Sequence, residues 1–214
     1  MSNEPVYRYP AGRILVFAKA PLPGRVKTRL ASGIGDRAAA TLYEQLVRDT
    51  ATTAVQARLA PVILYVGSSH PLFVALGDEY GIAIKTQQGA DLGLRMYSAI
   101  QDELEQADFV VLIGTDCPAM TADYLDQACG KLCAGTEFVF GPAEDGGYVL
   151  IGARSAVQQL FTDMRWSTSQ VMQHTRERLR LLDRRHAELD TLWDLDTPED
   201  LERWQTVTRS AITS

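Results

Sequence analysis

Residues 13–30, RILVFAKAPLPGRVKTRL, combine the two features on which the architecture of this chain depends. The first part, residues 13–18, has the length and apolar character of a buried strand, and it stops at two prolines and a glycine. Four basic residues then fall within eleven positions: Lys19, Arg25, Lys27 and Arg29. The loop is not a Walker A sequence, because the first glycine and the Gly-Lys pair of that motif are missing. It is interpreted as an anion-binding loop, with a solvated turn as the alternative.

The chain as a whole has the composition of a globular protein. Its 214 residues are 46% hydrophobic and 22% charged, so we expect a single domain over residues 1–214 with its core at about 13–204. The net charge of −6 argues against a nucleic-acid or anionic-membrane partner. No segment approaches the roughly 20 apolar residues of a membrane span. Since the N-terminus lacks the apolar core of a signal peptide, we expect a cytoplasmic protein.

Buried strands alternate with amphipathic helices along the first two-thirds of the chain. Beyond 13–18, strands are predicted at residues 61–66, 82–86, 108–114, 136–140 and 147–152. Three helices are predicted to begin after cap residues: one from Asp36 to about Leu59, one after Thr121 and one after Thr197. Other helices are predicted over 71–80, from the glycine turn at 87–96 through Leu104, and at about 155–161 and 168–179. This alternation predicts an α/β fold with a mainly parallel sheet covered on both faces. The closely spaced strands of the last third predict some antiparallel pairing.

Acidic residues follow three of the strand-like stretches, just as the basic loop follows the first strand. These acids are Asp116, Glu144, Asp145, Asp194 and Asp196. Because ligands of open α/β sheets bind beyond the carboxyl ends of the strands, we expect the acids and the cations at the same edge. Carboxylates suit a hard cation such as Mg²⁺, and Lys and Arg suit phosphate oxygens. The sequence therefore predicts a site for a metal-bound phosphate ligand.

Each acidic motif also has a purely structural interpretation. The Asp of GTDCP can form a turn, the Asp-Gly of EDGGY can form a hairpin, and Thr197 with Pro198 explains a helix start in DLDTPEDL. The three histidines form no spaced cluster, and no Ser/His/Asp set is visible. Three cysteines without a paired spacing indicate neither a disulfide framework nor a structural zinc site. The residues alone leave both interpretations of each acidic motif open.

Six motifs, in order along the chain, resemble one bacterial family. They are FAKAPLPGRVKTRLA, GADLGLRM, IGTDCPAMT, GPAEDGGYVLIG, RWSTSQV and WDLDTPEDL. Together they resemble the radical-SAM/selenodomain-associated transferase 1 family, within the nucleotide-diphospho-sugar transferase (GT-A) superfamily. The resemblance implies a three-layer α/β/α sandwich around a mostly parallel, mixed sheet. It also implies a transferase that requires Mg²⁺ or Mn²⁺ and uses a nucleotide and a small-molecule acceptor.

The resemblance further implies roles for residues that bind the metal and the nucleotide. Asp116 and Asp196 match metal ligands of the superfamily, with Asp194 as the weaker candidate. Lys27 and Arg25 are expected at the nucleotide phosphates as catalytic groups. Other nucleotide-binding residues are expected at Lys19, Arg29, Asp91 and Arg95.

The acceptor is expected at the DGG turn and the RWSTSQV segment. Asp145 would contact the acceptor and would act as the general base if the acceptor is a hydroxyl or thiol. Further acceptor contacts are expected from Gly146 and Gly147, and Trp166 is expected either to stack on an acceptor ring or only to pack. The sequence leaves open whether the chain works as a monomer or a homodimer.

Two chemistries are compatible with such a site, and both act mainly by positioning and charge neutralisation. In nucleotidyl transfer, a phosphorylated acceptor attacks a nucleoside triphosphate and pyrophosphate leaves. In glycosyl transfer, an acceptor attacks the sugar of a nucleotide sugar. A triphosphate carries about four negative charges and the metal cancels two, so several cations favour the first chemistry. The single Asp of TDCP, in place of the DxD of many glycosyltransferases, points the same way.

A non-catalytic nucleotide-binding module is the alternative from another class. Such a module would need the basic loop but not two metal-binding acids. Asp116 and Asp196 are both present, so an enzyme is favoured.

Overall fold

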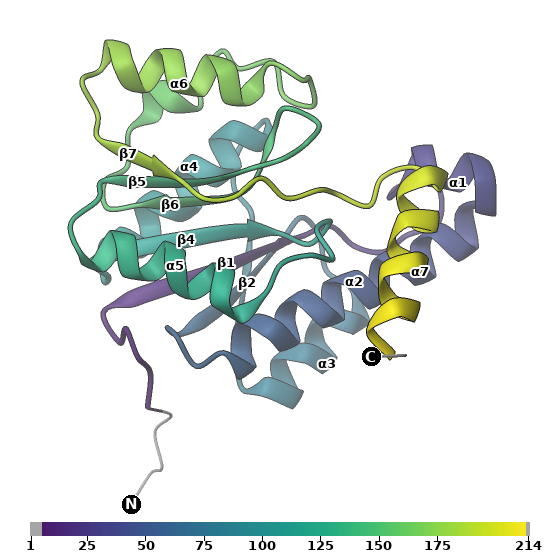
Figure 1. Cartoon of the computed structure of the whole chain (residues 1–214). Helices are drawn as coiled ribbons and strands as arrows, with labels where there is room; N and C mark the ends of the chain where they lie inside the picture. Colours follow the sequence, from purple (N-terminus) through teal and green to yellow (C-terminus); the bar gives the residue numbers. More distant parts are fainter. Residues whose placement is uncertain (1–5, 213–214) are drawn as a thin grey trace, which may run out of the picture.

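The computed structural model describes residues 6–212 of the chain (Figure 1). Within that range, seven strands form one sheet in the order β3-β2-β1-β4-β6-β5-β7. The strands are β1 (Gly12–Ala18), β2 (Val62–Val66), β3 (Ala83–Thr86), β4 (Phe109–Gly114), β5 (Phe138–Pro142), β6 (Tyr148–Ala153) and β7 (His186–Glu188). Strands β3, β2, β1 and β4 are parallel, β6 is antiparallel to β4 and β5, and β7 is parallel to β5. The predicted mixed, mostly parallel sheet is confirmed.

Helices cover both faces of this sheet, as Figure 1 shows. On one face lie α2 (Asp36–Gln56), α3 (Pro71–Tyr80) and α5 (Ala122–Cys133), and on the other lie α4 (Leu92–Leu104), the 3₁₀ turn η1 (Gln158–Leu160) and α6 (Val171–Leu181). Strand β1 contributes side chains to the cores on both faces of the sheet, because successive side chains of a strand point to opposite faces. Ile14 and Val16 join one core cluster, while Leu15 and Phe17 join the other. The predicted three-layer fold is confirmed. None of the helices in residues 6–212 is long and apolar enough to cross a membrane.

Two further helices meet at one end of the molecule. Helix α1 (Thr28–Ile34) begins within the basic loop, and α7 (Pro198–Ile212) lies beside it (Figure 1). A small apolar cluster joins them: Leu30, Leu46 and Leu195 are buried, and Leu201 and Trp204 pack against them. This cluster holds the segment before α7 next to the basic loop after β1.

The site-bearing edge follows from the topology. From β1 the chain continues to β2 and β3 on one side, whereas β4 pairs with the other side of β1. Such a reversal of strand order leaves a crevice at the carboxyl ends of the two strands, where ligands of open α/β sheets bind. Lys19 and Asp116 follow β1 and β4 at this point.

Several predicted boundaries are corrected by the structure. Asp36 does not cap α2, because Gly35 (φ 85°) is the cap residue and no side-chain cap hydrogen bond forms. The helix predicted at 155–161 is reduced to the short turn η1. The guanidinium of Arg178 donates to the carbonyls of Gln159, Thr162 and Asp163, which fixes the irregular segment that follows this turn. Helix α1 and strand β7 were not predicted.

Candidate active site

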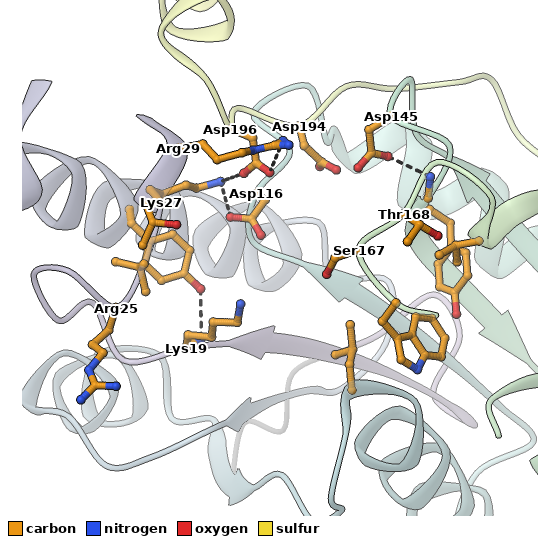
Figure 2. Close-up of a pocket in the computed structure, with 18 of the residues that line it drawn as sticks. Lys19, Arg25, Lys27, Arg29, Asp116, Asp145, Ser167, Thr168, Asp194 and Asp196 are labelled. Carbon is orange, nitrogen blue, oxygen red and sulfur yellow. Dashed lines mark hydrogen bonds and ion pairs between the residues drawn. The ribbon is translucent and has the colours of Figure 1, made fainter. Parts of the chain in front are cut away.

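A cavity of about 560 Å³ opens at the carboxyl edge of the sheet (Figure 2). The loops after β1 and β4, the β5–β6 turn and the segments that precede α6 and α7 all contribute to it. Most of the site residues predicted from the sequence line it: Lys19, Arg25, Lys27, Arg29, Asp116, Asp145, Gly147, Trp166, Asp194 and Asp196. The volume is that of a typical small-molecule site.

The basic loop places its cations at one end of the cavity (Figure 2). It turns at Gly24, whose φ of 73° suits glycine, and the Arg25 N–H donates to the Leu22 carbonyl at 2.9 Å. Lys27 follows with a left-handed backbone (φ 50°), and its carbonyl accepts the Ala31 N–H at 2.8 Å where α1 begins. This tight path separates Arg25 from Lys27 and directs the Lys27 side chain inward.

Lys27 is the most enclosed charged group of the cavity. Its side chain is 2% exposed, and its Nζ contacts Asp116 and lies 3.0 Å from Oδ1 of Asp196. The ring centroid of Tyr43 lies 5.9 Å from the same Nζ. Burial alone would lower the pKa of Lys27, but the two carboxylates outweigh it and raise the pKa above its usual value. Lys27 therefore stays charged.

The backbone joins the two acidic segments that meet at Lys27. The Leu195 N–H donates to the Asp116 carbonyl at 2.8 Å, which fixes the segment before α7 against the loop after β4. Asp200 then accepts hydrogen bonds from the Asp196 N–H at 3.0 Å and the Thr197 N–H at 2.8 Å. The Thr197 Oγ1 in turn accepts the Asp200 N–H at 3.3 Å, which gives α7 a capping box and confirms the cap predicted at Thr197. The acidic residues are thus positioned by main-chain bonds as well as by charge.

Asp194 lies near three other carboxylates, those of Asp116, Asp145 and Asp196. Burial, followed by the charges of Asp116, Asp145 and Asp196, raises its pKa to about 7, while Lys27 acts in the opposite direction. A cation bound nearby would favour the ionised form of this carboxyl group. Glu144, the neighbour of Asp145, is instead held by Arg203 through two hydrogen bonds of 2.7 and 3.0 Å.

The opposite end of the cavity is built from aromatic and small polar groups (Figure 2). Trp166 meets Tyr148 edge to face, with ring centroids 6.3 Å apart. The Trp166 indole N–H is buried and has no hydrogen-bond partner within the described part of the chain. Ser167 and Thr168 also line this end. Neither residue was predicted from the sequence to line the site.

The DGG turn has a well-defined geometry at this end. Oδ1 of Asp145 accepts the Gly147 N–H at 2.8 Å, which closes a tight turn. Gly146 has a φ of 88° and its carbonyl accepts the Met172 N–H at 2.8 Å, so it supports the start of α6. Gly146 does not line the cavity, whereas Asp145 and Gly147 do.

Two residues predicted to bind the nucleotide do not line the cavity. Asp91 caps α4 by accepting the Leu94 N–H at 2.8 Å, and the Arg95 Nε donates to the Gly89 carbonyl at 3.1 Å. Their neighbours Leu92 and Met96 line the cavity instead. A role of Asp91 or Arg95 toward the base or ribose stays a prediction.

Tyr43 is a cavity residue that the sequence did not reveal. Its hydroxyl accepts the Lys19 N–H at 2.9 Å and lies 2.9 Å from Oγ1 of Thr115. Burial and the charge of Asp116 raise its pKa, so the phenol stays neutral and connects the loops after β1 and β4. In the sequence, Tyr43 falls on the buried face of α2, where nothing distinguishes a site residue from a core residue.

The acidic residues fit a divalent cation only if a ligand completes the coordination. In residues 6–212, no three or more His, Cys, Asp or Glu side chains are grouped so that they could hold a metal ion by themselves. Asp116 and Asp196 nevertheless share one cation, the Lys27 ammonium, which shows that their carboxylates converge on a single positive charge. Mg²⁺ is commonly bound by one or two carboxylates together with substrate phosphates and waters. The donor set fits that pattern.

Comparison with known proteins identifies one family and one fold. The family described as "Uncharacterized protein conserved in bacteria (DUF2064)" matches residues 50–168. No curated protein matches the sequence. A crystal structure from Desulfovibrio desulfuricans G20, provisionally described as a nucleotide-diphospho-sugar transferase, is similar at 32% identity and a TM-score of 0.82, over 90% of this chain and 85% of that chain.

Two more distant structures share the fold, and each was solved with ligands bound. CMP:2-keto-3-deoxy-manno-octonic acid synthetase complexed with CTP aligns at a TM-score of 0.58 and 14% identity, over 94% of this chain and 99% of that chain. Glucosyl-3-phosphoglycerate synthase from Mycobacterium tuberculosis, solved with Mn²⁺, UDP and glucosyl-3-phosphoglycerate, aligns at a TM-score of 0.52 and 13% identity, over 95% of this chain and 77% of that chain. At such identities the likeness concerns the fold alone.

Proposed function

The chain belongs to the DUF2064 family and has the nucleotide-diphospho-sugar transferase fold, and on that premise we propose that it is a Mg²⁺- or Mn²⁺-dependent nucleotidyltransferase. Its substrates are a nucleoside triphosphate and a phosphorylated small-molecule acceptor, and pyrophosphate is released. The observation that carries this proposal is the meeting of Asp116 and Asp196 beside four basic side chains in one cavity.

The charges of the cavity suit a triphosphate better than a diphosphate. A triphosphate carries about four negative charges, and a bound divalent cation cancels two of them. Lys19, Arg25, Lys27 and Arg29 line the same cavity and can pair with the remaining negative charge. In a site that is partly shielded from water, such preorganised charge stabilises both the substrate and the departing pyrophosphate.

The transfer step has a simple balance of bonds. An acceptor oxygen attacks the α-phosphorus, a new O–P bond forms, and the bond to the oxygen that bridges the α- and β-phosphates breaks. The bonding electrons leave with pyrophosphate, which Arg25 and Lys27 neutralise. A metal ion held by Asp116 and Asp196 would act as a Lewis acid on the phosphate oxygens.

The acceptor decides whether a base is needed. A phosphate acceptor arrives ionised and has no proton to lose. A hydroxyl acceptor would pass its proton to Asp145, which lines the opposite end of the cavity and whose Oδ2 has no hydrogen-bond partner within residues 6–212.

Glycosyl transfer from a nucleotide sugar is the second candidate. The D. desulfuricans relative favours it, because that protein is described as a nucleotide-diphospho-sugar transferase and shares 32% identity with this chain. The aromatic pair of Trp166 and Tyr148 offers the kind of wall that sugars contact.

Ligand-induced stabilisation and product release distinguish these candidates. The full chain is heated with each of the four nucleoside triphosphates and with UDP-, GDP- and ADP-sugars, in Mg²⁺, in Mn²⁺ and in EDTA. A ligand at a hundred times its Kd should stabilise the protein by about 2.7 kcal/mol. Two results together support the proposal. A triphosphate stabilises the protein only when the metal is present, and pyrophosphate is released from that triphosphate when cell extract is added to supply the acceptor. Preference for a nucleotide sugar supports the second candidate. Metal-independent binding without turnover would overturn both and leave a nucleotide-binding module.

A further inference from the structure

The Lys27 ammonium lies where the proposed function places a metal ion. Its Nζ joins Asp116 and Asp196, which we call the acidic pair (Figure 2). The side chains of the acidic pair are 45% and 39% exposed toward the cavity, while that of Lys27 is only 2% exposed. One protein cation therefore already pairs with both carboxylates from the closed side of the site.

The acidic pair has little free coordinating capacity in this arrangement. Lys27 engages Oδ1 of Asp116 and Oδ1 of Asp196, and Arg29 lies 3.2 Å from Oδ2 of Asp196. Of the four carboxylate oxygens, only Oδ2 of Asp116 has no ion-pair partner within residues 6–212. A free divalent cation must either displace Lys27 and Arg29 or bind close beside two positive charges. Displacement would remove from the enclosed ammonium the two carboxylates that contact it, which is strongly unfavourable.

A triphosphate removes both obstacles at once. Its oxygens provide the metal ligands that the protein lacks, since residues 6–212 hold no metal-binding group of three side chains. The same oxygens offer new anionic partners to Lys27 and Arg29, which line the cavity with Lys19 and Arg25. The long, flexible lysine side chain can turn from one partner to the other without movement of the backbone.

The backbone of Lys27 is well suited to such an exchange. It is held in the left-handed region, which non-glycine residues rarely adopt, and its carbonyl is fixed by the Ala31 N–H at 2.8 Å. Such conformations persist only where the surrounding structure determines them. The main chain is thus fixed at the point from which the side chain reaches the acidic pair.

We propose that Lys27 keeps the acidic pair from binding a free divalent cation, so that metal and nucleotide bind as one complex when the phosphates take over Lys27 and Arg29. This inference rests on the proposed function and specifies the form in which its nucleotide enters. By thermodynamic linkage, the nucleotide then raises the affinity for the metal by the same factor as the metal raises the affinity for the nucleotide.

The first test measures binding of Mn²⁺ alone to the wild type and to Lys27→Met. Water-proton relaxation reports the binding, because it is enhanced when Mn²⁺ is immobilised on a protein. We expect Lys27→Met to bind free Mn²⁺ at least tenfold more tightly than the wild type does. Lys19→Met is the matched control, because it removes the same charge from the cavity without touching the acidic pair, and it should change the affinity less than threefold. Adding Asp116→Asn to Lys27→Met should abolish the gain.

The second test uses only the wild type, so it stands even if Lys27→Met does not fold. Inorganic tripolyphosphate replaces the nucleotide, which makes the test independent of the base. We expect little relaxation enhancement from Mn²⁺ alone and clear enhancement once tripolyphosphate is added. Tripolyphosphate should also bind at least tenfold more tightly in Mn²⁺ than in EDTA.

Neither test requires turnover, so this inference and the proposed function can fail separately. The inference is overturned if the wild type binds free Mn²⁺ as tightly as Lys27→Met does, or if tripolyphosphate brings no Mn²⁺ onto the protein. Coupled binding without any nucleotide turnover would sustain the inference and contradict the proposed reaction.

Discussion

The two ends of the cavity are held together by different forces. One end holds the basic loop; we propose that it binds the phosphates, and we call it the phosphate end. There, Lys27, Asp116 and Asp196 come from distant parts of the chain and are fixed by ion pairs and main-chain hydrogen bonds. We propose that the other end binds the acceptor, and we call it the acceptor end. There, Trp166 packs against Tyr148 and Gly146 forms a tight turn. Basic side chains bind phosphate groups but do not distinguish the molecules that carry them. A closely packed wall can distinguish acceptors by their shape. If the proposed function holds, the phosphate end determines the reaction and the acceptor end determines the substrate.

The largest effect is expected at the phosphate end, from Asp116→Asn. Loss of the negative charge should lower kcat/KM by about 10²–10³-fold, the range seen when one preorganised electrostatic contact is removed. The fold should persist, because the main-chain bond from Leu195 to the Asp116 carbonyl is unchanged. Asp126→Asn is the matched control, since Asp126 binds Arg8 and Tyr9 outside the cavity. Activity at the wild-type level in Asp116→Asn would contradict the proposal that Asp116 binds the metal. It would also contradict the proposal that the phosphate end determines the reaction.

The sequence predicted the fold because its signals are local. Apolar runs of strand length and amphipathic helices are visible in single segments, so the layers and the mixed sheet were predicted. Strand β7 (His186–Glu188) was missed because it is short, its ends are exposed and only pairing with β5 defines it. Helix α1 was missed because Gly24 and the prolines before it made the whole segment resemble a loop.

The candidate site was predictable only where it depends on the ends of predicted strands. Asp116 and Asp145 follow predicted strands, and strand ends converge, so their proximity could be inferred from topology. The pairing of Lys27 with two carboxylates could not, because opposite charges in a sequence do not indicate which partners meet. Tyr43 carried no signal beyond helical periodicity, and the contacts of Trp166 depend on a segment without regular structure.

At the acceptor end, Gly146→Ala should be the most damaging single change. A Cβ at this position would lie 2.1 Å from the Ser169 carbonyl oxygen, and the φ of 88° already disfavours any side chain. The backbone strain alone costs about 1–3 kcal/mol, and the clash must add to it. Gly135→Ala is the matched control, because Gly135 has a similar φ of 97° and, within residues 6–212, only its chain neighbours come within 4 Å of the place that an added methyl group would take. Urea unfolding should show a larger loss for Gly146→Ala, and equal losses would mean that close packing does not hold this end.

Asp200→Asn should have an intermediate effect, which depends on pH. Burial raises the pKa of Asp200, but hydrogen bonds from Asp196 and Thr197 outweigh it and hold the pKa below its usual value. The carboxylate therefore contributes stability above the unfolded pKa, and this contribution is lost as the pH falls through the lower folded pKa. We expect a loss of about 1 kcal/mol at pH 7, typical of a helix cap.

The pH series of unfolding measurements is what tests that interpretation. The difference between wild type and Asp200→Asn should shrink as the pH is lowered from 7 toward 3, whereas Glu199→Gln, an exposed neighbour in the same helical turn, should show little difference throughout. A difference that does not depend on pH would show that the charge of Asp200 does not position Asp196.

The smallest effect is expected for Trp166→Phe on triphosphate binding, and it tests whether the two ends are independent. The indole N–H has no hydrogen-bond partner in the described part of the chain, so phenylalanine removes no bond from the free protein. All four cations that line the cavity lie at its other end (Figure 2), so the Kd for tripolyphosphate in Mn²⁺ should change less than about twofold, or 0.4 kcal/mol. Arg25→Gln, which removes a cation from the phosphate end, should weaken the same binding by about tenfold. Thermal-shift titration measures both variants on one scale. Equal weakening would mean that the aromatic end also supports the phosphates, and the division between reaction and substrate selection would then have to be abandoned.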